Sequence, residues 1–141
     1  MIVYVFYLVA LAVCALAYWK GDRTLRLTAV VFIVSWALTP MVVHLDRRGL
    51  NLPVAVIDIT TAAVFVWISM RSRRVWGAVL SALAIIPIAI RFVAAADPAV
   101  HNDSRAASNN VVVLLQLLVM VIATRLAVRA RRRADEGAVR S

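Results

Sequence analysis

Five long apolar stretches, separated by short polar ones, account for most of the chain. Each holds between 17 and 22 residues, and they cover residues 2–19, 27–43, 53–70, 75–96 and 111–128. An α-helix rises 1.5 Å per residue, so about 20 apolar residues cross the ~30 Å hydrocarbon core of a bilayer. The pattern therefore predicts an all-α integral membrane protein with five transmembrane helices.

One polar interval is too short to cross a bilayer. The third and fourth stretches are separated only by Arg71-Ser72-Arg73-Arg74, so these two helices must be antiparallel neighbours. Residues 97–110 are rich in Asn, Asp, Ala and Ser, which is typical of a solvated loop. We predict one five-helix domain over residues 1–128, with residues 129–141 as a disordered basic cytoplasmic tail.

Composition agrees with a lipid environment and changes how the charge is interpreted. Hydrophobic residues make up 64% of the 141 residues, and the formal net charge is +9. In a soluble protein this charge would suggest nucleic acid, but here the basic residues lie in the connectors and the tail. We expect them to contact anionic lipid headgroups at the basic face of a bilayer, and we predict no nucleic-acid partner.

The basic residues are distributed unequally between the two sides. Lys and Arg collect on the cytoplasmic side of bacterial membrane proteins. Three lie on one predicted side, namely Arg47, Arg48 and Arg105, and twelve on the other: Lys20, Arg23, Arg26, Arg71, Arg73, Arg74, Arg125, Arg129, Arg131, Arg132, Arg133 and Arg140. This bias predicts an outside N-terminus and a cytoplasmic C-terminus.

Two ionisable residues interrupt the third and fourth apolar stretches. Asp58 lies twelve residues before Met70, and Arg91 lies sixteen residues after Val75. Counted from the shared turn, their depths differ by four residues, or about 6 Å of rise. A structural ion pair between the two helices is one interpretation. Asp58 could instead line a wet cavity as a proton or cation site, contact a partner protein, or be hydrated near the interface.

Other polar side chains fall at comparable depth in the predicted helices. Such residues hydrogen-bond neighbouring helices together, and a cluster of them can also line a binding cavity. The set comprises Thr39, Thr60, Thr61 and Gln116.

A metal site is a second candidate, outside the apolar stretches. His44 and Asp46 form one H-x-D pattern, and His101 and Asp103 form another, both on the predicted outer side. Imidazole and carboxylate can bind Zn²⁺ or Mn²⁺, although ordinary loop polarity explains the same residues. The chain has no P-loop, GxSxG, HExxH or CxxC motif, and we predict no cofactor.

The segment from Val56-Ile57-Asp58 to Arg71-Ser72-Arg73-Arg74-Val75-Trp76 is similar to small uncharacterised inner-membrane proteins of alphaproteobacteria. These pair an apolar helix bearing one Asp with a basic turn followed by an aromatic residue and Trp. Gly21-Asp22-Arg23 after the first helix and the Arg-rich C-terminal end fit the same outline. This chain departs from the outline with Val75 in place of an aromatic residue and Gly77 in place of Pro. The resemblance implies a bacterial inner-membrane protein and no particular activity.

Three classes of function follow. The chain could be a non-enzymatic accessory or interaction subunit of a membrane complex. Five short helices with little extramembrane mass favour this class. It could be a small oligomeric transporter or channel with Asp58 as a proton or cation site. An enzyme would need a convergent acid, base and nucleophile, and the spans carry one carboxylate, so we predict no enzymatic activity. Other membrane proteins or further copies of the chain are the expected partners.

Overall fold

The structure is a computed structural model, all-helical over the residues that it describes. These are residues 2–45, 51–97 and 102–139, with side chains described over 5–45, 51–97 and 107–138. Four of the five helices found there, α2 to α5, are long and apolar enough to span a membrane. The five are α1 (Ile2–Lys20), α2 (Arg23–Val42), α3 (Leu52–Ser72), α4 (Val75–Ala96) and α5 (Asn102–Val139).

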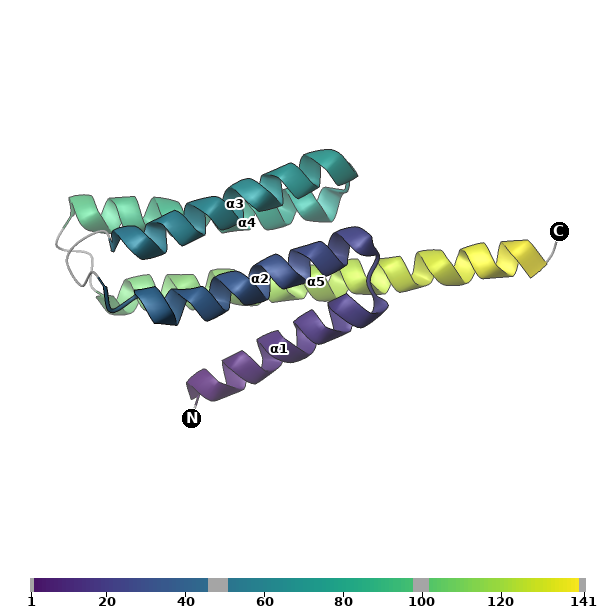
Figure 1. The fold of residues 1–141 in the computed structure, drawn as a ribbon, viewed down its shortest axis with the longest axis horizontal. Helices are drawn as coiled ribbons and strands as arrows, with labels where there is room; N and C mark the ends of the chain where they lie inside the picture. The colour runs from purple at the N-terminus through teal and green to yellow at the C-terminus, as the bar shows by residue number, and fades with distance from the viewer. Residues whose placement is uncertain (1, 46–50, 98–101, 140–141) are drawn as a thin grey trace.

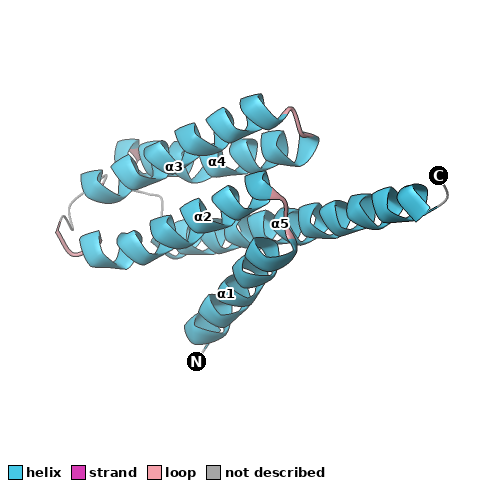
Figure 2. Ribbon diagram, turned by 45° about the vertical axis from the view of Figure 1, so that its right-hand side comes forward, coloured by secondary structure: helices cyan, strands magenta, loops and turns pink. Residues whose placement is uncertain are grey.

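The helices pack in chain order and close into a ring, and Figure 1 shows them lying lengthwise beside one another. Each contacts its sequence neighbour, α5 returns to contact α1, and α2 also touches α5 inside the ring. Figure 2 shows α1 leaving the other four helices at a wide angle towards its N-terminal end. The ring thus has a tight region near the α1–α2 turn and an open region at the opposite end.

Small side chains allow the close packing in the tight region. Ala10, Cys14 and Ala17 are buried on one face of α1, at spacings that place them in a line along a helix. They belong to one core cluster with Ala29 of α2 and Met120 of α5. Lipid tails are as apolar as these side chains, so close packing rather than escape from water holds such helices together.

The two helices of the α3–α4 hairpin pack closely at Gly77. A Cβ atom added there would lie 3.2 Å from the Cα atom of Ser69. The connecting turn is short because Arg73 adopts a left-handed conformation (φ 50°) and Arg74 is extended. The Arg73 N–H donates to the Ser69 carbonyl over 2.9 Å, which ends α3 and reverses the chain at once.

Asp22 joins the two turns at the basic end of the bundle. Its Oδ1 atom accepts a hydrogen bond from the Leu25 N–H over 3.0 Å and caps α2. Its Oδ2 atom lies 2.7 Å from Arg74 Nη2, in the α3–α4 turn. Arg131 of α5 donates to the Gly21 carbonyl over 2.9 Å. The α1–α2 turn, the α3–α4 turn and α5 are therefore held together at this end.

Two predictions about non-helical segments need correction. The sequence predicts a disordered tail over 129–141 and a loop over 97–110, yet α5 runs from Asn102 to Val139; residues 98–101, 140 and 141 lie outside the described residues. Ala and Arg are strong helix formers, and the apolar part of α5 supplies the nucleus from which a helix propagates at low cost. At 1.5 Å per residue, α5 is about 57 Å long, and Figure 1 shows it extending well past the other helices.

Candidate functional site

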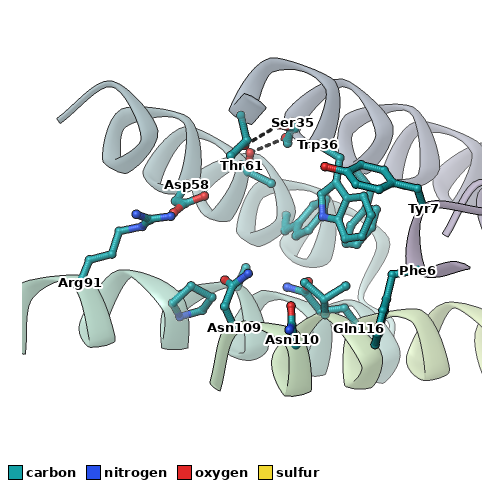
Figure 3. Close-up of a pocket in the computed structure, with 16 residues that line it drawn as sticks. Phe6, Tyr7, Ser35, Trp36, Asp58, Thr61, Arg91, Asn109, Asn110 and Gln116 are labelled. Atoms are coloured by element: carbon teal, nitrogen blue, oxygen red, sulfur yellow. Dashed lines mark hydrogen bonds and ion pairs between the residues drawn. The ribbon is translucent and has the colours of Figure 1, made fainter. Parts of the chain in front are cut away.

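A cavity of about 290 Å³ lies among the helices, towards the end opposite the basic turns. All five helices contribute to its walls (Figure 3). Its volume is at the small end of ligand pockets, which span roughly 300–1,000 Å³. It combines polar side chains from α2 to α5 with aromatic ones from α1, α2 and α3.

Asp58 and Arg91 form the charged part of the wall. Arg91 Nε donates to Asp58 Oδ2 over 2.7 Å, which joins α3 to α4. The Asp58 side chain is 24% exposed and the Arg91 side chain is 18% exposed. The contact leaves the second carboxylate oxygen and both terminal nitrogens of the guanidinium without a hydrogen bond to another described residue. Their contact agrees with the sequence count, in which the two residues differ by four positions in their distance from the α3–α4 turn.

Ser35 and Thr61 bring α2 and α3 together beside this pair. Their hydroxyl oxygens are 2.5 Å apart, and each also lies within 2.8 Å of the carbonyl four residues earlier in its own helix. A hydroxyl has one proton, so two hydroxyls can donate only two of these three bonds. Thr39 donates to the Ser35 carbonyl over 2.8 Å and lines the same cavity one turn further along α2.

Three amide side chains of α5 form the opposite wall. Figure 3 shows Asn109, Asn110 and Gln116 on α5, across the cavity from Asp58 and Thr61. The asparagines are exposed, whereas Gln116 is 7% exposed. The Gln116 amide forms no hydrogen bond to the described part of the chain, although it faces the cavity. A water molecule or a ligand in the cavity can therefore pair with this amide.

Aromatic rings close the side of the cavity nearest α1. The Tyr7 and Trp36 rings meet edge to face with centroids 5.2 Å apart, and Trp36 stacks on Phe32 at 5.6 Å. Aromatic pairs of this kind prefer these geometries. The cavity therefore has one apolar wall and one polar wall.

Asp58, Arg91, Thr39, Thr61 and Gln116, which the sequence singles out, all line this one cavity. Thr60 does not, since it is exposed and donates to the Val56 carbonyl of its own helix over 2.7 Å. Asn109 and Asn110 were assigned to a loop and missed as site residues. The two consecutive amides directly before the apolar run of α5 were the signal that could have found them.

The four residues predicted to bind a metal ion are not seen together in the part of the chain that the structure describes. His44 is exposed after the end of α2, while Asp46 and His101 lie outside the described residues. Asp103 is in α5, but its side chain is also outside the described part. Within that part, no group of three or more His, Cys, Asp or Glu side chains is placed to hold a metal ion. The metal site stays a prediction.

Comparison with models of known families, with curated proteins and with solved structures finds no match for the chain.

The geometry of the cavity suits binding better than covalent chemistry. Its carboxylate already accepts from an arginine, and its other polar groups are hydroxyls, amides and a phenol. Serine, threonine and tyrosine are weak nucleophiles without an adjacent base, and no His lines the cavity within the described residues. A site of this composition can orient a polar molecule and can hold water.

Proposed function

We propose that the chain is a non-enzymatic protein of the bacterial inner membrane that acts as an accessory subunit of a larger membrane complex. It would cross the bilayer five times, with the N-terminus in the periplasm and the C-terminus in the cytoplasm. The unequal distribution of basic residues supports this orientation. The likeness in layout to alphaproteobacterial inner-membrane proteins supports the location.

The observation that carries the proposal is an apolar crevice between α1 and α2. It measures about 280 Å³ and is lined by residues of α1 and α2, two helices that Figure 2 shows diverging towards the N-terminus. Three of the nine residues that line it are small, namely Ala10, Cys14 and Ala37, and of these three Ala37 is exposed. The small exposed side chain of Ala37 lets a further helix backbone approach closely, which a flexible lipid chain does not require. We assign this crevice to a transmembrane helix of the partner.

Affinity purification from native membranes in mild detergent, with mass spectrometry of the retained proteins, tests the proposal. We expect a stoichiometric membrane complex that is lost in Ala37→Phe, because the ring would fill the crevice. Leu38→Phe is the matched control, since Leu38 is 42% exposed and does not line the crevice. Recovery of the chain as a homo-oligomer alone, or equal loss in both variants, would contradict the accessory role.

The orientation has its own test by cysteine labelling in a Cys14→Ala background. His44→Cys should react with a membrane-impermeant maleimide in intact spheroplasts. Ala134→Cys, in the basic extension of α5, should react only after permeabilisation. The reverse pattern would invert the topology without affecting the fold.

A small oligomeric transporter or channel is the second candidate, and the position of Asp58 in a polar cavity favours it. This function predicts an ion- or proton-dependent flux in proteoliposomes that Asp58→Asn abolishes while the protein stays folded. The 2.7 Å contact with Arg91 weighs against Asp58 as a site for a free cation, because a bare cation would add an uncompensated positive charge beside a carboxylate that the guanidinium already neutralises. Absence of flux in the unmodified protein would eliminate this candidate.

A further inference from the structure

The Asp58–Arg91 pair is only partly saturated by its own contact. A guanidinium has five N–H donors and a carboxylate has two acceptor oxygens. The observed bond joins one donor, Nε, to one acceptor, Oδ2. The remaining donors and the second oxygen have no other hydrogen-bond partner among the described residues. Both side chains line the cavity (Figure 3), so a ligand can reach one positive and one negative group side by side.

The charge of the cavity limits what it can hold. Asp58 and Arg91 are its only formally charged side chains in the described part of the chain, so its net charge is zero. A ligand with a net charge would be transferred from water without full compensation, which is costly in a membrane interior. A ligand that is neutral overall but carries both signs would satisfy each free valence with a charge-assisted bond.

The other walls are suited to the rest of such a molecule. The buried Gln116 amide is unpaired within the described residues and offers both a donor and an acceptor. The Tyr7 and Trp36 rings face the cavity across from Gln116. There they can cover an apolar group or an alkylammonium.

We propose that this cavity binds a zwitterion, a molecule with one ammonium and one carboxylate or phosphate group, with its ammonium at Asp58 and its anion at Arg91. Two sources share this chemistry: a free amino acid, and the headgroup of phosphatidylethanolamine. The site would serve an accessory subunit and a carrier equally, so its existence is independent of which of these functions holds.

Calorimetric titration of the purified protein tests the free source with three probes of similar shape. L-Leucine carries both charges, leucinamide only the ammonium, and 4-methylpentanoate only the carboxylate. The protein is placed in nanodiscs of phosphatidylglycerol, which lack the competing headgroup. Native mass spectrometry and competition by phosphatidylethanolamine, with phosphatidylglycerol as control, test the lipid source.

We expect saturable binding of leucine or of phosphatidylethanolamine at one site per chain. The zwitterion should bind about tenfold or more tightly than the single-charge relatives, since each relative lacks one of the two charge-assisted hydrogen bonds. Binding of leucine identifies a free solute, and selective retention of phosphatidylethanolamine identifies a lipid. Equal binding of leucinamide or of 4-methylpentanoate, or no saturable binding of either zwitterion, would overturn the proposal.

Variants keep the test specific to the cavity. Asp58→Asn and Arg91→Gln should each weaken zwitterion binding about tenfold, and the charge-swapped variant Asp58→Arg/Arg91→Asp should recover part of it with the ligand reversed. Asp22→Asn removes the ion pair with Arg74, at the opposite end of the helices, and should leave binding unchanged. Equal loss in Asp22→Asn would show a general effect on folding and would contradict the assigned site.

Discussion

Arg91 and Asp58 meet over 2.7 Å between α4 and α3, inside a cavity to which all five helices contribute. The pair joins the two halves of a hairpin at the end opposite the short Arg73–Arg74 turn. It therefore has a structural role whatever the cavity binds. The pair also gives the cavity one positive and one negative group, since the second carboxylate oxygen and the terminal guanidinium nitrogens are not used in this contact.

Breaking this pair should destabilise the bundle. Asp58→Asn or Arg91→Leu leaves one charge uncompensated at a partly buried position, and we expect each to lower the free energy of unfolding by about 1–3 kcal/mol, between surface and fully buried pairs. The double variant should cost less than the sum of the two. Unfolding in mixed micelles with increasing dodecyl sulfate measures all four proteins. Additive losses would show that the two side chains do not interact.

Gly77 should tolerate no large side chain. Gly77→Leu places new atoms against Ser69, whose Cα is 3.2 Å from the first added carbon. Overpacking of this kind costs about 1–3 kcal/mol, visible as a lower midpoint in the same unfolding assay. Ala78→Leu is the control, because Ala78 is exposed on the neighbouring face. Equal midpoints for the two variants would contradict the close helix approach.

The two roles of Asp22 can be separated by substitution. Asp22→Asn keeps a side chain that can cap α2 but removes the charge opposite Arg74. Asp22→Ala removes both, and loss of a cap costs about 0.5–2 kcal/mol. We expect the alanine variant to unfold at a lower dodecyl sulfate fraction than the asparagine variant. If the asparagine variant lost as much as the alanine one, the ionic contact rather than the cap would dominate.

Residue spacing predicted the part of the site that depends on helix geometry. Four residues of offset between Asp58 and Arg91 place them about one turn apart, and a long arginine side chain covers that distance. The same reasoning placed Thr39, Thr61 and Gln116 at a comparable depth. Spacing does not say which face of each helix points inwards, so their convergence on one cavity, and the exclusion of Thr60, needed the structure.

The predictions for the polar segments at the two ends of α5 were wrong for a different reason. A hydropathy pattern separates apolar helices from everything else, so it cannot distinguish a polar helix from a loop. The residues before Val111 and after Val128 are polar, yet they continue α5 at both ends. The Ala- and Arg-rich composition of the second segment was a readable helix signal. Asp22 was also only partly predictable. Asp directly before a helix is a capping pattern that the sequence shows, whereas its contact with Arg74 depends on how two hairpins pack.

Water access to Thr61 tests most directly whether a polar cavity lies within the bundle. In a Cys14→Ala background, Thr61→Cys lines the cavity, whereas Ile59→Cys lies two residues away at a position whose side chain is 46% exposed on the outer surface of the helices. A small, membrane-impermeant cationic methanethiosulfonate is applied to spheroplasts. We predict rapid labelling at position 61 from outside and little at position 59, which faces lipid. Equal labelling at both positions, or an unreactive Thr61→Cys, would contradict the cavity.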